Sequence, residues 1–129
     1  MPLEAQWWAT DMAVFTAARD KSQWDWTAMI VVPDRITAEL LERAVAKVAG
    51  KSRPPSLDQV RLETLHEGLC VQTLHIGSYD DEAEILEALR HHHIPDSGLC
   101  MTGKHHEIDA RRLERAKLRT ILRQPVERT

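Results

Sequence analysis

The sequence predicts an α+β domain in which antiparallel strands carry helices on one face. Six short segments have the composition of strands and are separated by turn residues. Two other segments repeat apolar residues at helical spacing. The chain has 129 residues, 43% of them hydrophobic, which is enough to close one modest core. We therefore expect a single domain over residues 1–129.

The expected strands are bounded by glycine, proline and polar turn residues. Met29-Ile30-Val31-Val32 is a mostly β-branched run closed by Pro33 and Asp34. Glu67-Gly68 predicts a tight hairpin between the strands on either side. Residues 9–21 are expected to form a turn or irregular helix, and residues 109–117 a basic, partly helical connection. The six expected strands are residues 2–9, 24–32, 60–66, 69–76, 100–108 and 119–126.

The first expected helix is the clearest element of the chain. Thr37 can cap its start and Gly50 can stop it. Ile36 and Leu41 are placed as a hydrophobic staple. The apolar residues that recur at helical spacing are Leu40, Leu41, Ala44, Val45 and Val48.

The second expected helix begins at Asp81-x-x-Glu84, which has the pattern of a capping box. It carries Ile85, Leu86 and Leu89 as its apolar residues. Acidic residues at its start and basic residues at its end suit the helix dipole. We therefore interpret the acidic run at residues 80–82 as a solvated helix start.

Composition excludes several classes of function. The chain has 17 basic and 20 acidic side chains and a net charge of −3, which argues against nucleic-acid binding through phosphate neutralisation. No apolar run approaches the roughly 20 residues of a membrane span, and the first residues do not resemble a signal peptide. We therefore expect a cytoplasmic protein with Cys70 and Cys100 as free thiols.

Four tryptophans stand in the first quarter of a chain that has one tyrosine and one phenylalanine. On a strand, Trp24 and Trp26 would share a face, whereas Trp7 and Trp8 would point to opposite faces. At most three of the four indoles can therefore easily form one wall. Such a wall would suit a planar ligand, although tryptophans also fill protein cores.

Metal and nucleophile chemistry find little support in the sequence. The seven histidines include His91, His92 and His93, which fan out around a helix and cannot converge on one ion. No nucleophile elbow, activated cysteine motif or phosphate-binding glycine loop is present in the sequence. We expect no cofactor and no metal.

Glu107 is the preferred catalytic candidate because it lies in the middle of an expected strand. A carboxylate on a half-buried sheet face is costly unless it is used or paired. The alternative is a surface glutamate that pairs with Lys104 or with an arginine of the tail. Glu63 and Glu67 are rival candidates.

Several blocks of the sequence together resemble the GyrI-like small-molecule-binding proteins. Each block is weak alone, but they follow the family's order over nearly the whole chain. They are Trp7-Trp8, residues 24–30, 60–64, 67–72 and 74–80, the Gly103-Lys104-His105-His106-Glu107-Ile108 block, and residues 118–126.

The resemblance implies two strand-helix-strand-strand modules that pack side by side around a ligand cleft. It narrows to a branch whose members include hydrolases that open the strained cyclopropane of planar DNA-alkylating natural products. By this analogy Glu107 is the pocket glutamate and His106 a ligand-binding residue. The aromatic walls would be Trp7, Trp8, Trp24, Trp26 and Tyr79.

The sequence differs from the family pattern in two places. A strand and a helix are missing before the first expected strand, so either the true start lies upstream or a homodimer partner completes the module. The family's tyrosine two residues after the glutamate is absent, because the sequence runs Glu107-Ile108-Asp109, as though about three residues had been deleted. The resemblance thus leaves two readings open, a hydrolase of planar electrophiles and a binder that sequesters drugs without turnover. A protein-interaction domain of the gyrase-inhibitor type is a third.

Overall fold

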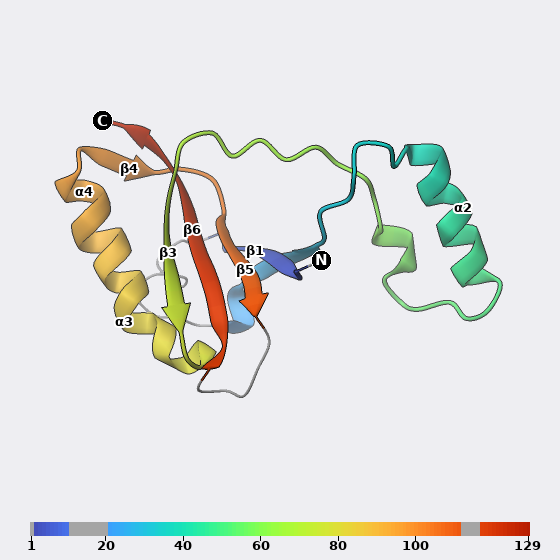
Figure 1. Cartoon of the computed structure of the whole chain (residues 1–129), viewed down its shortest axis with the longest axis horizontal. Helices are drawn as coiled ribbons and strands as arrows, with labels where there is room; N and C mark the ends of the chain where they lie inside the picture. The colour runs from blue at the N-terminus through green and yellow to red at the C-terminus, as the bar shows by residue number, and fades with distance from the viewer. Residues whose placement is uncertain (1, 11–20, 112–116) are drawn as a thin grey trace. The chain divides into compact units, whose positions relative to one another are not determined.

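The computed structural model describes residues 2–10, 21–111 and 117–129 (Figure 1). They fall into two compact units, one made of Met1–Ile30 with Glu67–Thr129 and the other of Val31–His66. Most of the expected turn at residues 9–21, and much of the connection at residues 109–117, lies outside the described residues. The expected single domain stays a prediction.

The first unit is built on an antiparallel sheet, which confirms the α+β class predicted from the sequence. Its strands follow the order β2-β1-β5-β6-β3, and β4 pairs with β6. A short 3-10 turn, η1 (Lys21–Gln23), precedes β2. The strands are β1 (Glu4–Trp8), β2 (Asp25–Met29), β3 (Cys70–Ile76), β4 (Leu99–Met101), β5 (His105–Arg111) and β6 (Arg119–Arg128).

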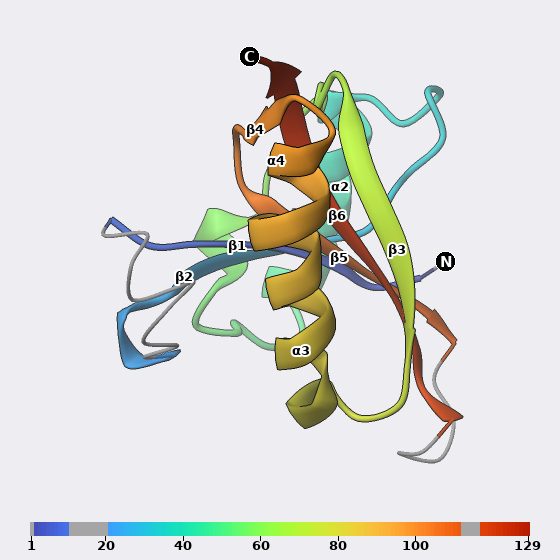
Figure 2. The same ribbon diagram turned by 90° about the vertical axis from the view of Figure 1, so that its left-hand side faces the viewer.

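One helical run covers one face of this sheet (Figure 2). Its segments are η3 (Tyr79–Asp81), α3 (Glu82–Glu87), the π-helical η4 (Ala88–His93) and α4 (Ile94–Asp96). Leu89 and Ile94 pack with Val126 of β6 to form a buried cluster. Leu122, the fully buried side chain near the middle of β6, continues the apolar interior.

The second unit contains α2 (Ala38–Ala49) and the 3-10 turn η2 (Leu57–Gln59). The Thr37 hydroxyl accepts a hydrogen bond from the Leu40 N–H at 3.3 Å, and Gly50 is the C-cap. Both predicted ends of this helix are confirmed. The cap satisfies one of the backbone donors that the first turn leaves without a partner.

One strand prediction is wrong, and a second is wrong in part. Residues 60–66 form no strand, so the hairpin at Glu67-Gly68 does not exist. The strand expected over residues 24–32 ends at Met29, and the next residues, Ile30 and Val31, are exposed. β-branched composition favours a strand only where a partner strand and a packed face are available.

Gly103 divides the strand expected over residues 100–108 into β4 and β5. Its φ of +55° lies in the left-handed region, which side chains disfavour. A Cβ at this position would also lie 3.3 Å from Pro125 Cγ. The chain therefore turns here, and β5 starts afresh at His105.

The second helix also differs from its prediction. Asp81 makes no capping hydrogen bond, because its Oδ2 accepts from the Ser78 hydroxyl at 2.9 Å instead. The helical run continues beyond His93 to Asp96. Glu82 is buried rather than solvated, with 4% of its surface exposed.

Candidate active site

A cavity of about 520 Å³ opens between the β2-β1-β5 part of the sheet and helix α3. The helical run supplies part of the lining of this cavity. All lining residues belong to the first unit. They are Leu3, Glu4, Ala5, Trp7, Trp24, Trp26, Ala28, Tyr79, Glu82, Leu86, Arg90, His105, Glu107 and Asp109.

Three indoles form one wall of the cavity. Trp7 of β1 lies directly opposite Trp26 of β2 in the strand register, and their ring centroids are 6.0 Å apart. Trp24 meets the Trp7 ring edge-on, also at 6.0 Å. The edge-on arrangement is one of those that aromatic rings prefer. Trp26 is 59% exposed, so much of its ring is available for contact.

His105 and Glu107 point into the cavity from alternate positions of β5. The His105 Nε2 lies 2.9 Å from the Glu107 Oε1. His105 is almost completely buried, and this burial lowers its pKa although the interaction with Glu107 works in the opposite direction. The imidazole is therefore neutral at neutral pH. Its Nε2 carries the proton, because a carboxylate oxygen can only accept.

Glu107 is held as a carboxylate. Burial alone would raise its pKa, but hydrogen bonds from His105 and Glu82 and the charge of Arg90 together lower it. The strand places this oxygen acceptor on the face that the indoles share. A carboxylate so positioned can orient a water molecule and accept a proton from it.

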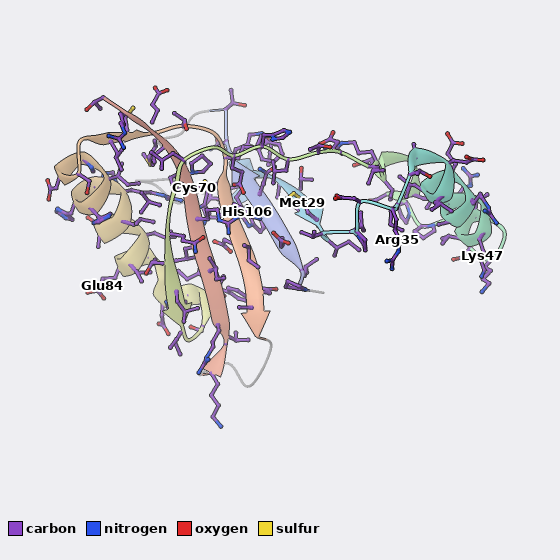
Figure 3. All side chains as sticks on the ribbon, turned by 45° about the horizontal axis from the view of Figure 1, so that its top comes forward. Met29, Arg35, Lys47, Cys70, Glu84 and His106 are labelled. Carbon is purple, nitrogen blue, oxygen red and sulfur yellow. The ribbon has the colours of Figure 1, made fainter. Side chains whose placement is uncertain are left out.

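Glu82 and Arg90 are cavity residues that the sequence analysis missed. They are 4% and 5% exposed. The signal was present in their spacing, since each lies four residues from Leu86 and therefore shares its face of the helix. By contrast, Glu84, which lies two residues after Glu82, is exposed on the outer side of the helix (Figure 3).

Tyr79 and Asp109 close another side of the cavity. The Tyr79 hydroxyl donates a hydrogen bond to Asp109 Oδ1 at 2.9 Å. Asp109 stands two residues after Glu107 on β5, so this hydrogen bond joins η3 to β5 at the cavity.

The structure separates the residues proposed from the sequence into two groups. Glu107, Trp7, Trp24, Trp26 and Tyr79 line the cavity. Trp8 and His106 do not, because strand alternation turns both toward the other face of the sheet. The Lys104 Nζ lies over the Trp8 ring, 3.6 Å from its centroid, in a cation-π contact.

His106 lies among the strands of the sheet (Figure 3) and belongs to a buried polar cluster on that other face. Its Nε2 lies 2.8 Å from Glu4 Oε1, and its Nδ1 lies 2.9 Å from Glu67 Oε1. Arg123 donates to the same Glu67 oxygen at 3.1 Å. His106 therefore joins two carboxyl groups from β1 and from the segment before β3 across the sheet.

The other rival carboxylate, Glu63, is exposed and pairs with Arg61 in the second unit. Cys70 and Cys100 are free thiols. The described ranges contain no cluster of three or more histidine, cysteine or acidic residues that could hold a metal ion. Within the same ranges, no helix has the length and apolar character needed to cross a membrane.

Solved structures of similar fold come from Listeria innocua. One is an uncharacterized conserved protein, with 34% identity and a TM-score of 0.83 over 98% of this chain and 63% of its own. A second is a hydrolase, with 33% identity and a TM-score of 0.76 over 98% of this chain and 62% of its own. A third, a hydrolase encoded by lin2189, has 30% identity and a TM-score of 0.78 over 98% and 63%.

The chain therefore spans less than two thirds of the length of each of these proteins. No family model and no curated protein matches it. The comparison thus shows a small α+β fold shared with bacterial proteins, two of which are named as hydrolases.

We expect His106→Ala to lower the free energy of unfolding by about 3–5 kcal/mol, because it leaves two buried carboxylates without their shared partner. Urea denaturation followed by tryptophan fluorescence measures this loss. His106→Gln keeps a donor and an acceptor and should lose less. His91→Ala, at an exposed position, is the control, and an equal effect of the two alanine variants would contradict the assignment.

Stability should also fall as the pH drops below about 6.5, the ordinary pKa of a histidine. The pKa of folded His105 lies below that value, so in this window the unfolded chain binds a proton that the folded chain does not. One such proton gives a slope of up to about 1.4 kcal/mol per pH unit. The stability that Glu107 contributes is lost only as the pH falls below its own ordinary value of 4.5, so the two windows are distinct.

Urea denaturation at a series of pH values measures this slope. His105→Gln should flatten it between pH 6.5 and 5, whereas the exposed His91→Gln should not. Parallel curves for the wild type and His105→Gln would refute the buried neutral imidazole.

Proposed function

We propose that the chain binds planar aromatic or hydrophobic xenobiotics in the tryptophan-lined cavity and hydrolyses electrophilic, cyclopropane-bearing DNA alkylators. The observation that carries this proposal is the convergence of Trp7, Trp24 and Trp26 with Glu107 on one cavity. We also propose that the fold is of the GyrI-like type, with the helical run and strands β3 to β6 as its complete module.

The indole wall supports the binding part of the proposal. Flat rings stack on flat polycycles, and the exposed Trp26 offers its surface without any rearrangement of the core. A cavity of about 520 Å³ also lies within the range of small-molecule sites. A polycycle held between the indoles would place its edge toward β5.

The carboxylate supports the catalytic part. A water molecule bound to Glu107 attacks the electrophilic ring carbon, and a new carbon–oxygen bond forms as a carbon–carbon bond of the cyclopropane breaks. Glu107 takes the proton that the water loses, and the electron pair of the broken bond moves onto the conjugated system of the substrate. Release of ring strain lowers the barrier, so positioning supplies much of the required effect.

His105 keeps the base in place. Its Nε2–H hydrogen bond to Oε1 fixes the orientation of the Glu107 carboxylate in the cavity. The His105 side chain is already immobilised by its burial, so holding Glu107 in this geometry costs little additional side-chain entropy. Two relatives of similar fold named as hydrolases agree with a water-dependent reaction.

A second candidate is a binder that sequesters cationic aromatic drugs without transforming them. Glu82, Glu107 and Asp109 line the cavity together with the indoles. Carboxylates and aromatic faces both attract a flat cation, and each cation-π contact adds roughly 0.5 to 2 kcal/mol. Binding without turnover by the wild-type protein would favour this reading.

We expect Glu107→Gln to lower kcat by about 10²- to 10⁴-fold, because it removes the proton acceptor while keeping the size of the side chain. The dissociation constant should change by less than about threefold. Product formation from a planar alkylator with an activated cyclopropane gives kcat, and quenching of tryptophan fluorescence by a non-reactive analogue gives the dissociation constant. An unaltered rate would remove Glu107 from the mechanism.

Trp26→Ala should raise the dissociation constant of the planar analogue about tenfold, which corresponds to about 1.4 kcal/mol of lost stacking. Trp8→Ala is the matched control, because this indole belongs to the neighbouring strand but lies outside the cavity. Isothermal titration calorimetry compares the two variants without relying on fluorescence. Equal affinities for Trp26→Ala and the wild type would show that the wall does not bind the ligand.

A further inference from the structure

A second carboxyl group, that of Glu82, lines the same cavity as Glu107. It comes from the first turn of α3, whereas Glu107 comes from β5. Only 4% of Glu82 is exposed. The two carboxyl groups thus come from a helix and from a strand and meet at the same cavity.

The two groups share a hydrogen bond, which helps to lower the pKa of Glu107. A hydrogen bond between two carboxyl groups requires a proton on one of them. Burial favours the neutral form of Glu82, which is 4% exposed, whereas Glu107 also accepts a hydrogen bond from His105, so the proton is assigned to Glu82. The pair thus carries one proton and one negative charge.

The surrounding charges agree with this state. Arg90, 5% exposed and on the same helical face, brings one positive charge to the pair. His105 faces Glu107 from β5 and is neutral, and Tyr79 and Asp109 are hydrogen bonded to each other at the side of the cavity. A pair with two negative charges would bury one charge more than the guanidinium of Arg90 balances among the described lining residues, which is costly.

On the basis of the hydrolytic function proposed above, we propose that Glu82 is the general acid of the site and Glu107 its general base. Glu82 protonates the substrate atom that receives the electron pair of the broken carbon–carbon bond. Glu107 removes a proton from the attacking water. The substrate class is therefore an electrophile whose strained ring is conjugated to a heteroatom that can accept a proton.

The proton count closes over one turnover. The substrate gains one hydroxyl group at the opened carbon and one proton at the heteroatom, which is the addition of one water molecule. After the step Glu107 is protonated and Glu82 is ionised. The proton then passes across the hydrogen bond between them, which restores the starting state without any outside donor.

Glu82→Gln tests the acid role, and Glu84→Gln, at an exposed position of the same helix, is the matched control. The amide of glutamine can still donate a hydrogen bond to Glu107 but cannot transfer a proton at neutral pH. We expect kcat for the cyclopropane substrate to fall at least 10²-fold in Glu82→Gln and to change less than threefold in Glu84→Gln. The dissociation constant of the non-reactive analogue should stay within threefold of the wild type in both.

A loss of less than about tenfold in Glu82→Gln would overturn the acid role. Glutamine can still hold Glu107 in position, so a small loss would mean that Glu82 only positions the base. Infrared spectra of protein with labelled glutamate provide a second readout that needs no substrate. The wild type should show a protonated carboxylic acid at neutral pH that Glu82→Gln lacks, and absence of this band in the wild type would also overturn the proposal.

The two proposals fail in different ways. A wild-type protein that binds the analogue but turns over no activated cyclopropane would overturn hydrolysis and, with it, the acid role. An active wild type whose Glu82→Gln variant remains active would overturn the acid role alone and leave the hydrolytic function standing.

Discussion

The register between β1 and β5 is the constraint on which the site depends. Trp7 pairs with His105 and Ala5 pairs with Glu107, while Trp7 also pairs with Trp26 of β2. Directly opposed residues share a face of the sheet, so this register brings the indole wall and Glu107 together. A slip of one residue would turn the whole set to the other face. The small Ala5 opposite Glu107 leaves room for a ligand beside the carboxylate.

The same alternation sorts the charged residues of these strands into two clusters, although Glu4 of the second cluster also contributes to the cavity lining. One face carries Glu107 with Glu82 and Arg90, and the other carries His106 with the carboxylates of Glu4 and Glu67. Burial of charge is tolerable only where partners satisfy it. His106 therefore contributes to the stability of the sheet, while its neighbour His105 supports the chemistry, although the two are adjacent in the sequence.

Local patterns were sufficient to predict much of this arrangement and failed where tertiary contacts decide. The cap at Thr37 and the division of the four tryptophans follow from spacing alone. The strand predicted at residues 60–66 fails because its apolar residues, such as Val60, find no packed face. His106 was assigned to the ligand because the resemblance does not say which face of β5 each histidine occupies. Glu82 was missed because acidic residues at a helix start are usually solvated. Here the side chain is buried and lines the cavity together with Arg90.

Different parts of the helical run over the sheet contribute to the core and to the cavity. Its later part, with Leu89 and Ile94, packs against Val126 and forms the buried cluster. Its first turn, with Glu82, faces the cavity instead. Between them lies the π-helical η4, a geometry often found at functional sites, in which the consecutive residues Leu89 and Arg90 are both buried. Leu89 belongs to the buried cluster and Arg90 lines the cavity, so this short segment contributes one residue to the core and the next to the site.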